Sequence, residues 1–422
     1  MLPVQGKPSY DDKVLGREKE FAKGGPDPEK EDEVMLVRER VSRIYYNRHF
    51  FDYPISMKPE TIKNMGLFTT FKAGMSYLGS CIKKRPETNL ENFYINRFGK
   101  VLYSMFFEGY TEKLWGRHPR EISADWGAQR VKGLSIRAII KDIFSKIFGK
   151  KDNSNAETSL IEQFWYPKYG PGQLWETVES NCEAAGVKVL TDARVVEVRQ
   201  TDGAVSSVVY EDSEGNRTEL SGDQFISSMP VKDLVNAIDA AGADPEAVDS
   251  KPAPADMTEV ANGLPYRDFV TVGLLVKHLK LKNTTSIPTL GNPPIVPDCW
   301  IYVQDPGYKV GRLQIFNNWS PYLVKDVDDT VWIGLEYFCE EGDSFWNMSE
   351  EDVTKFAISE LTRMRVINGP DEVIDSHRER VRKAYPAYFD TYEHMDELIE
   401  YLDGFGNLYC VGRNGQHRYN NM

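Results

Sequence analysis

Two loops carry most of the residue types that could bind a ligand. In "YPKYGPGQLWE", Gly170 and Gly172 stand just before a predicted helix. Backbone N–H groups at a helix N-terminus attract anions, and glycine lets a ligand approach them closely. In "VGRNGQHRYNNM", Gly412 and Arg413 follow a predicted strand at 408–411, and open α/β sheets bind cofactors at the carboxyl ends of their strands. Each pattern alone also fits an ordinary loop.

Other recognisable catalytic patterns are missing from the sequence. We find no Ser-His-Asp signature, no P-loop, no paired-cysteine motif and no G-x-G-x-x-G turn. The six histidines and five cysteines are scattered without the spacing of metal ligands, so we expect no metal site. The odd number of cysteines argues against a disulfide framework. Together with the lack of an apolar signal segment, it favours a reduced, cytoplasmic protein.

The composition indicates a globular protein and limits its partners. The chain of 422 residues is long enough for two or three domains of about 150 residues. Its net charge of −13 argues against nucleic-acid binding, which needs clustered Lys and Arg. No apolar run approaches the roughly 18 residues that span a bilayer. Nucleic acid is therefore not an expected partner, whereas a small-molecule substrate is the partner implied by the resemblance described below.

The elements that must position these loops follow a mixed pattern. We expect a polar insertion or loop at 1–35 and a strand-plus-helical domain at 36–160. In the latter, "RIYYNRHFFDY" predicts two strands around an Asn-Arg turn. The segment 134–148 has helical apolar spacing with many Lys and Arg, as in helices on membrane surfaces. We favour a core-facing helix with a charged outer side, so membrane contact stays open but is not favoured.

From residue 161 onwards helices and strands alternate. We expect a helix from Gly172 to a stop at Gly186, then strands joined by a turn at Asp202-Gly203. "DQFISSMP" predicts a buried strand ending at Pro230. A second β-rich block and two helices precede the closing strand. These patterns predict an α/β fold with mixed sheets.

The segments "YPKYGPGQLWETV", "ARVVEVRQTDGAVSSVVY", "FISSMP", "GRLQIFNNWSPY", "KAYP" and "GRNGQHRYNNM" resemble the UDP-galactopyranose mutase branch of the FAD-dependent amine-oxidase and protoporphyrinogen-oxidase-like superfamily. The resemblance covers about residues 36 to 422. It implies a partial glutathione-reductase-type FAD-binding domain at 161–235 and 403–422. This domain would be interleaved with a mixed-sheet substrate domain at 236–402 and with the helical domain.

The resemblance implies FAD as cofactor, with NAD(P)H as a candidate reductant. It places these residues along the flavin: Gly170, Gly172, Val195, Gly412, Arg413, Asn421 and Met422. Val195 would meet the adenine through its backbone, and the Gly-Arg pair would lie beside the pyrophosphate. The last two residues would lie against the ribityl chain and isoalloxazine, and the two glycines before the helix would line the flavin side of the cleft.

The resemblance also implies a substrate pocket. Arg312 would bind the pyrophosphate of a nucleotide sugar, with Tyr385 and Tyr419 in the same pocket, because guanidinium binds phosphate in a bidentate manner and Tyr offers both a ring and a hydroxyl. Trp165 stands where related mutases have a second arginine, which leaves the mutase reaction open. From the residues alone, Arg312 could instead form a strand ion pair, Tyr385 could simply pack, and Trp165 and Trp175 could be core.

The expected function is therefore flavin chemistry. In a mutase, reduced flavin N5 attacks the anomeric carbon of a nucleotide sugar; in an oxidoreductase, N5 accepts a hydride. Neither reaction needs a side-chain nucleophile. Because the family's G-x-G-x-x-G lies ahead of anything present here, a truncated, inactive fragment unable to bind FAD is the alternative. A membrane-surface-associated protoporphyrinogen-oxidase-like enzyme is the third.

Overall fold

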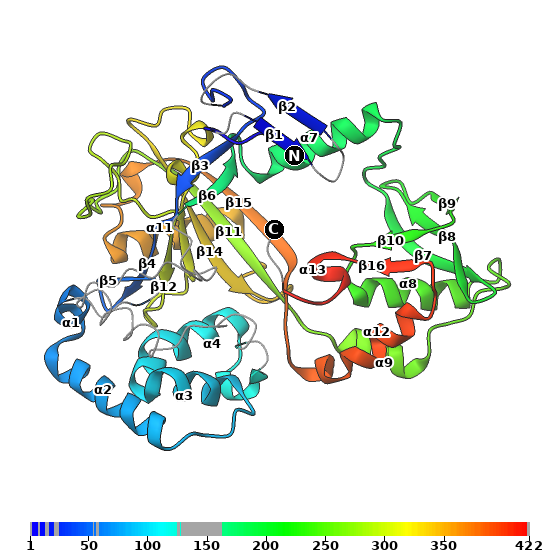
Figure 1. The fold of residues 1–422 in the computed structure, drawn as a ribbon, viewed down its shortest axis with the longest axis horizontal. Coiled ribbons are helices and arrows are strands. Elements are labelled where there is room, and N and C mark those ends of the chain that lie inside the picture. Colours follow the sequence, from blue (N-terminus) through cyan, green and yellow to red (C-terminus); the bar gives the residue numbers. More distant parts are fainter. Residues whose placement is uncertain are drawn as a thin grey trace. The chain divides into compact units, whose positions relative to one another are not determined.

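A computed structural model describes residues 2–6, 9–12, 17–20, 25–53, 55, 59–124, 127 and 163–419. The chain divides into two compact units. Unit 1 comprises Met1–Pro119, Gly127–Lys188 and Phe269–Arg380, and unit 2 comprises Arg120–Trp126, Val189–Asp268 and Val381–Met422. Each unit draws on three separate segments, so the two are interleaved along the sequence. The predicted mixed α/β fold is confirmed (Figure 1). The predicted substrate domain, 236–402, contributes to both units, and the other predicted domain ranges stay predictions.

The strands have between three and 14 residues. They are β1 Ser9–Asp12, β2 Arg17–Glu20, β3 Met35–Glu39, β4 Ser42–Tyr46, β5 His49–Asp52, β6 Gln163–Pro167, β7 Arg194–Thr201, β8 Ala204–Glu211, β9 Arg217–Ser221, β10 Phe225–Ser227, β11 Tyr266–Val276, β12 Trp300–Val303, β13 Arg312–Ile315, β14 Val331–Cys339, β15 Val373–Pro386 and β16 Leu408–Cys410.

The helices lie between and after these strands. The α-helices are α1 Pro59–Met65, α2 Leu67–Ile82, α3 Leu90–Tyr103, α4 Gly109–Trp115, α7 Pro171–Ala184, α8 Val231–Ala243, α9 Ala255–Gly263, α10 Phe316–Trp319, α11 Glu350–Met364, α12 Met395–Asp403 and α13 Gly412–Gly415. A π-helical turn, Ser104–Glu108, joins α3 to α4. Of the predicted segments, 134–148 lies outside the described residues, as do Asn421 and Met422.

Unit 1 is built on a seven-stranded sheet in the order β15-β11-β14-β13-β12-β4-β5. β12 pairs in parallel with β4 and antiparallel with β13, so the sheet is mixed. Strand β14 is almost entirely buried, as expected for a central strand covered on both faces. The apolar core around this sheet includes Val353, Ala357 and Leu361 from α11. The predicted Asn-Arg hairpin is confirmed: Asn47 and Arg48, with φ of 48° and 61°, join β4 to β5.

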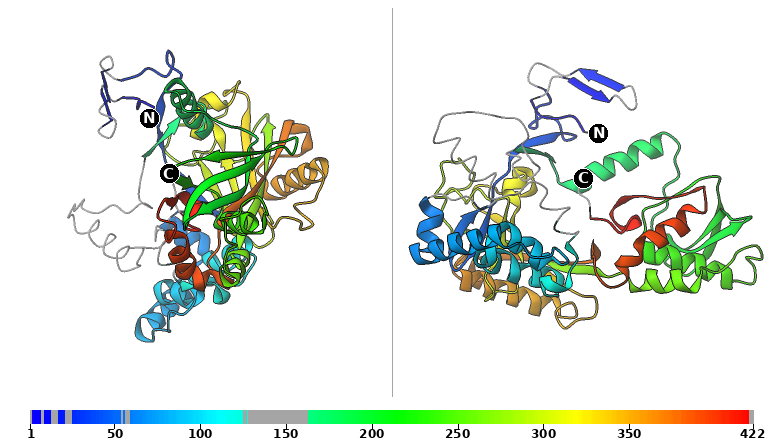
Figure 2. Two further views of the ribbon diagram at one scale, coloured as in Figure 1. Left: turned by 90° about the vertical axis from the view of Figure 1, so that its right-hand side faces the viewer. Right: turned by 60° about the horizontal axis from the view of Figure 1, so that its bottom comes forward.

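Helices α2 and α3 of unit 1 lie side by side (Figures 1 and 2). Gly99 has a φ of 78° inside α3, and a Cβ there would come within 2.7 Å of the Tyr77 backbone nitrogen in α2. Only glycine combines this conformation with so close an approach. The two helices therefore meet backbone to backbone.

Unit 2 has a three-stranded antiparallel sheet, β7-β8-β9, and a separate parallel pair, β10-β16. The predicted turn at Asp202 and Gly203 joins β7 to β8, with φ of 53° and 79°. Buried side chains of α8, α9 and α12 form one apolar core with those of β7 and β8; these include Leu234, Met257 and Leu398.

The predicted burial of the strand in "DQFISSMP" is wrong. β10 is a three-residue strand in which Ile226 is 73% exposed. Its register partner in β16, Tyr409, is also exposed, because among the described residues this parallel pair has one covered face only. An apolar run of this length does not tell whether one face or both are covered.

Candidate functional site

The carboxyl ends of the parallel strands β10 and β16 lie together in unit 2. Ser227 pairs with Cys410, and Val411 N donates to Ser227 O at 2.9 Å. The chain then turns at Gly412, with a φ of 77°, into the short helix α13. Gly415 closes this turn, because a Cβ there would lie 2.7 Å from Ser227 O. The prediction that Gly412 and Arg413 follow the end of a strand is confirmed.

Two polar side-chain atoms at this strand end are buried without a hydrogen-bond partner among the described residues: Ser227 Oγ and Asn414 Oδ1. A buried polar group with no partner costs free energy of about 1–3 kcal/mol. Such groups are few in native proteins and often mark a place where a water or ligand binds. The strand end therefore has unused hydrogen-bonding capacity at a position where α/β sheets bind cofactors.

In unit 2, Arg413 contacts two tyrosines, Tyr385 and Tyr419, that were predicted to bind substrate. Its Nη1 donates to Ala384 O at 2.9 Å, and its guanidinium carbon lies 5.6 Å from the ring centre of Tyr385 and 4.7 Å from that of Tyr419. The two rings stack with centroids 5.9 Å apart and an interplanar angle of 13°. A cation over aromatic faces is a favourable contact. Arg413 thus holds β15 and the C-terminal loop in one cluster.

His417 was not singled out from the sequence, and it is fully buried in unit 2. Its Nε2 lies 3.0 Å from Ala387 O, and its ring meets Tyr266 edge to face at 4.8 Å between centroids. Burial lowers the pKa of His417 to about 4. A histidine in a polar loop gives no sequence signal of burial, so this residue could be found only from the fold.

Val195, the predicted adenine contact, lies near the start of β7. It pairs with Tyr210 of β8 next to a bulge, and its side chain is partly buried against the core of unit 2. A bulge redirects the backbone groups on either side of it. The hydrogen-bonding pattern at Val195 is therefore interrupted by the register shift between Val195 and Glu197. The contact of Val195 with adenine stays a prediction.

The other predicted flavin loop belongs to unit 1. β6 leads through a turn to Gly170, whose φ of 93° suits glycine, and α7 begins at Pro171 with Gly172 in its first turn. Asp32 accepts from Lys168 Nζ at 2.7 Å and fixes the turn. Trp165 and Trp175 are 48% and 52% exposed, so the alternative that they are core residues is wrong.

Arg312 lies on β13 of unit 1, directly opposite Glu336 on β14. Its Nη2 is 2.7 Å from Glu336 Oε2, and its guanidinium carbon is 5.6 Å from the Phe338 ring centre. Both side chains are largely buried. The ion pair named as an alternative for Arg312 is therefore present, and any anionic ligand would share this arginine with a carboxylate.

A second buried charged cluster in unit 1 was missed by the sequence reasoning. Lys113 of α4 donates from Nζ to Val303 O at 2.8 Å, Asp305 O at 3.2 Å and Val310 O at 3.0 Å. Burial lowers the pKa of Lys113 to about 8. Glu360 accepts from Val310 N at 3.0 Å on the other side of that residue. The cluster fixes the loop between β12 and β13 rather than forming a pocket.

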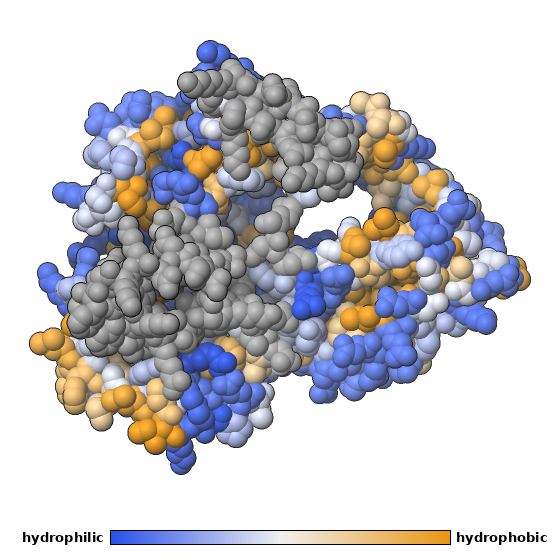
Figure 3. Space-filling model, in the orientation of Figure 1, coloured by the Kyte–Doolittle hydropathy of each residue, from blue (hydrophilic) through white to orange (hydrophobic). Residues whose placement is uncertain are grey.

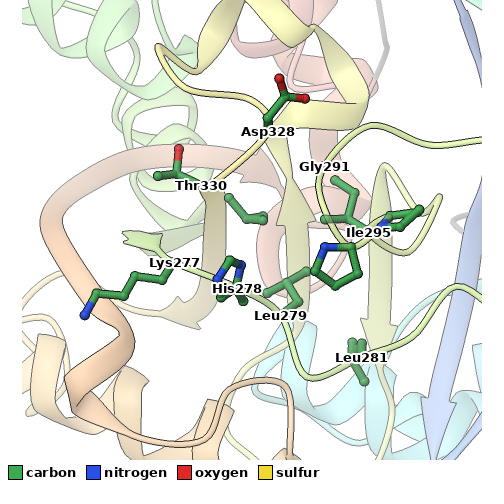
Figure 4. Close-up of a pocket in the computed structure, with 11 residues that line it drawn as sticks. Lys277, His278, Leu279, Leu281, Gly291, Ile295, Asp328 and Thr330 are labelled. Atoms are coloured by element: carbon green, nitrogen blue, oxygen red, sulfur yellow. The ribbon is translucent and has the colours of Figure 1, made fainter.

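A small hollow in unit 1 lies where β11 ends and β14 begins (Figure 4). It is lined by His278, Leu279, Ile295 and Thr330 among others. None of the residues predicted to bind cofactor or substrate lines it. We assign it no role.

Among the described residues, no helix is long and apolar enough to cross a membrane. In the same part of the chain, no group of three or more His, Cys, Asp and Glu side chains could hold a metal ion.

No family model matches this sequence, and no curated protein matches it by sequence either. Solved structures do match. Reduced UDP-galactopyranose mutase superposes with a TM-score of 0.68 at 17% identity, over 91% of this chain and 75% of that one. A protein assigned as a protoporphyrinogen oxidase, from Exiguobacterium sp. 255-15, gives 0.58 at 12%, over 90% and 76%. Wild-type putrescine oxidase bound to putrescine gives 0.51 at 14%, over 98% and 89%.

These identities establish a likeness of fold. The chain shares the fold of these three proteins, so the resemblance is confirmed for the fold. Within it, the structures that match include both a sugar mutase and oxidases, so the fold alone does not select a reaction.

Proposed function

We propose that this chain is the polypeptide of a FAD-dependent enzyme and that unit 2 contacts the cofactor. The observation that carries the proposal is the carboxyl end of β10 and β16. There, Ser227 Oγ and Asn414 Oδ1 are buried without partners in the described structure, and Gly412 leaves the strand with a left-handed backbone. A bound dinucleotide would supply the missing hydrogen bonds at the usual cofactor position of this class of sheet.

The residues present fit one side of a flavin site. Gly412, Asn414 and Ser227 would contact the cofactor directly, and the backbone at Val195 would meet the adenine. Arg413 would contribute positive charge near the diphosphate while Ala384 O and two tyrosine rings keep it in place. No G-x-G-x-x-G turn lies within these 422 residues, so the contacts proposed for them are at the end of β10 and β16. Gly170, Gly172, Asn421 and Met422 remain proposed contacts.

Bound FAD would supply N5, either as an acceptor of hydride from a C–H or C–N bond or as a nucleophile toward the anomeric carbon of a nucleotide sugar. Unit 1 favours the first of these. Trp165 brings no positive charge to the position of a second arginine, and Arg312 is paired with Glu336. A sugar diphosphate carries two charges that such a site would neutralise poorly. We therefore rank an oxidoreductase acting on a small molecule above a mutase, which would in addition need a reductant such as NAD(P)H.

Titration with FAD tests the proposal. We expect the purified chain either to carry flavin absorbance or to quench the fluorescence of added FAD and to unfold at a higher temperature with it. FMN and ADP are the comparison ligands, because each provides only one half of FAD. A colourless chain that neither quenches FAD nor gains stability from it overturns the proposal and favours the inactive alternative.

Asn414→Leu sharpens the test. Replacing an unpaired buried polar atom with an apolar group of similar size should leave the ligand-free protein equally stable or slightly more stable. The same change should weaken FAD binding about tenfold if Oδ1 bonds the cofactor. Asn407→Leu is the matched control, because the Asn407 amide already bonds Val205 N and O, at 3.0 Å and 2.8 Å. That variant should lose stability.

A further inference from the structure

Helix α2 of unit 1 carries its apolar side chains on the outside. The exposed stripe consists of Leu67, Phe68, Phe71, Met75, Leu78 and Ile82, each between 55% and 88% exposed. At about 100° per residue these positions fall within an arc of roughly 100° on the helix. Figure 3 shows the apolar surface gathered at the lower left, over this helix.

The opposite side of α2 is small and polar, and it is the side that faces the protein. Ala73 and Ser80 are its buried residues, and Ser76 Oγ accepts from Val101 N at 3.3 Å. The backbone at Tyr77 meets Gly99 of α3. A surface helix of a globular protein normally turns its apolar stripe toward the core. In α2 the orientation is reversed, so the stripe does not pack into the core formed by the described residues.

The charge of this part of the chain is also unlike that of the rest. Between Glu60 and Glu87 the sequence has no acidic residue. It has basic ones at Lys63, Lys72, Lys83, Lys84 and Arg85. The protein as a whole carries a net charge of −13, so this positive segment is a local exception. Lys72 Nζ lies 4.4 Å from the Phe68 ring centre, beside the stripe, and Lys83 to Arg85 follow its C-terminal end.

We propose that α2 is the contact of this protein with an anionic membrane surface. An interfacial helix lies in the plane of the membrane with aromatic and aliphatic side chains inserted and with Lys and Arg at the headgroups. Helix α2, with 16 residues and a length of about 24 Å, has this arrangement. Each basic residue near an anionic leaflet strengthens binding about fivefold.

A second copy of the chain fits this surface less well. In a two-fold symmetric contact the same patch meets itself. The positive segment would then face its own equivalent, with Lys72 close to the middle of the contact, and like charges would repel. Anionic lipid instead complements both the apolar stripe and its basic border. The proposal does not depend on whether the chain binds FAD.

Vesicle flotation with the full chain tests the proposal. We expect the protein to float with phosphatidylcholine vesicles that contain phosphatidylglycerol and not with phosphatidylcholine alone, and high salt should weaken the binding. The double change Phe71→Glu and Met75→Glu should abolish flotation. Because both side chains already face solvent, circular dichroism should show an unchanged fold. Met75→Gln with Leu78→Gln, which adds no charge, is the second variant and should weaken flotation.

Matched controls lie in unit 2. Val248→Glu places the same charge at another exposed apolar residue, and Lys251→Glu removes a basic residue outside the α2 segment. Both should float as the wild type does, whereas Lys72→Glu with Lys83→Glu should bind at least fivefold more weakly. The proposal is overturned by a wild type that stays at the bottom of the gradient, or by α2 variants that float normally. It is also overturned if sedimentation shows a dimer that the Phe71 and Met75 changes dissociate while no flotation occurs.

Discussion

Arg312 and Glu336 face each other across the β13–β14 ladder, with the Nη2 of the arginine 2.7 Å from Oε2 of the glutamate. The other carboxylate oxygen, Oε1, accepts from Gln314 Nε2 at 2.5 Å. The carboxylate is therefore held from two sides, and the arginine is held within the sheet. This arrangement decides how Arg312 could bind a substrate phosphate, because the carboxylate competes for the same guanidinium.

Glu336→Gln keeps the side-chain volume and removes the competing charge. If Arg312 binds the diphosphate of a nucleotide sugar, this change should strengthen binding of that sugar about tenfold, and Arg312→Met should abolish it. Calorimetric titration with UDP and a UDP-sugar measures both effects. If Arg312 serves only the ion pair, neither change will alter nucleotide binding, and both will lower the free energy of unfolding by about 1–3 kcal/mol.

Arg43 on β4 of the same sheet and Asp298, just before β12, provide the control for that experiment. Arg43 bonds Asp298 through Nε at 2.9 Å and Nη2 at 2.6 Å, and the carboxylate is fully buried. Arg43→Met leaves a buried charge without its partner and should cost about 3–5 kcal/mol of stability. Because no substrate role is proposed for Arg43, nucleotide binding should not change.

Gly415→Ala tests the close approach of α13 to β10. The added Cβ would lie 2.7 Å from the Ser227 carbonyl oxygen, so α13 must move away. We expect a loss of about 2–3 kcal/mol, with faster hydrogen exchange at the Val411 amide that donates to Ser227 O. Gly406→Ala is the control, because Gly406 has a φ of 66° but no atom within 4 Å of an added Cβ. It should cost only the conformational strain, about 1–2 kcal/mol, and leave the Val411 amide protected.

His417 should make the stability of unit 2 depend on pH. Burial lowers its pKa to about 4, whereas in the unfolded chain the pKa is about 6.5. Between these values the unfolded chain binds more protons, so stability falls as the pH is lowered through this window. The contribution present above pH 6.5 is roughly 3 kcal/mol, and it is lost by about pH 4.

His417→Gln isolates this effect, because glutamine does not titrate and can still donate to Ala387 O. Urea unfolding at several pH values gives the difference between wild type and variant. That difference should shrink as the pH falls from 6.5 to 4, since the variant lacks this titration. A difference that stays constant with pH would show that protonation of His417 is not linked to folding.

The elements that could be predicted from the sequence are those bounded by characteristic turn or capping residues. The hairpins at Asn47-Arg48 and Asp202-Gly203, the helix that stops at Gly186 and the strand before Gly412 all have turn or capping residues at the required positions. β15, with 14 residues, was missed because "VIDSHRERVRKAYP" has polar side chains on both faces. Such a strand is stabilised by pairing with a strand far away in the sequence, here β11, so the periodicity of its own residues does not predict it.

In the candidate site, too, some residues could be predicted from the sequence, whereas their contacts could not. The glycines and Arg413 could be found from loop composition and the resemblance. The partners of Arg413 and Arg312 depend on strand register, which links residues far apart in the sequence. For α2, the sequence predicts the helix but not its orientation. Its helical period is visible in the sequence, but the side of the helix that faces solvent depends on the approach of α3 at Gly99.

Lys113 should be among the most important side chains for the stability of unit 1. Its ammonium donates to three backbone carbonyls and ties α4 to the loop between β12 and β13. Lys113→Met keeps the apolar length of the side chain but removes the ammonium donor from all three carbonyls, of which Asp305 O retains Tyr308 N at 3.4 Å. We expect a loss of about 2–4 kcal/mol, measured by urea unfolding. Glu360→Gln is the milder comparison. One carboxylate oxygen of Glu360 accepts from Lys309 N and the other from Val310 N. The single amide oxygen of glutamine can keep only one of these bonds, so the cost should be about 1–2 kcal/mol. A Lys113→Met protein as stable as the wild type would mean that these carbonyls find water instead. In that case, the loop would still be held by Glu360 and by Arg363, whose Nη2 donates to Gly307 O at 2.6 Å.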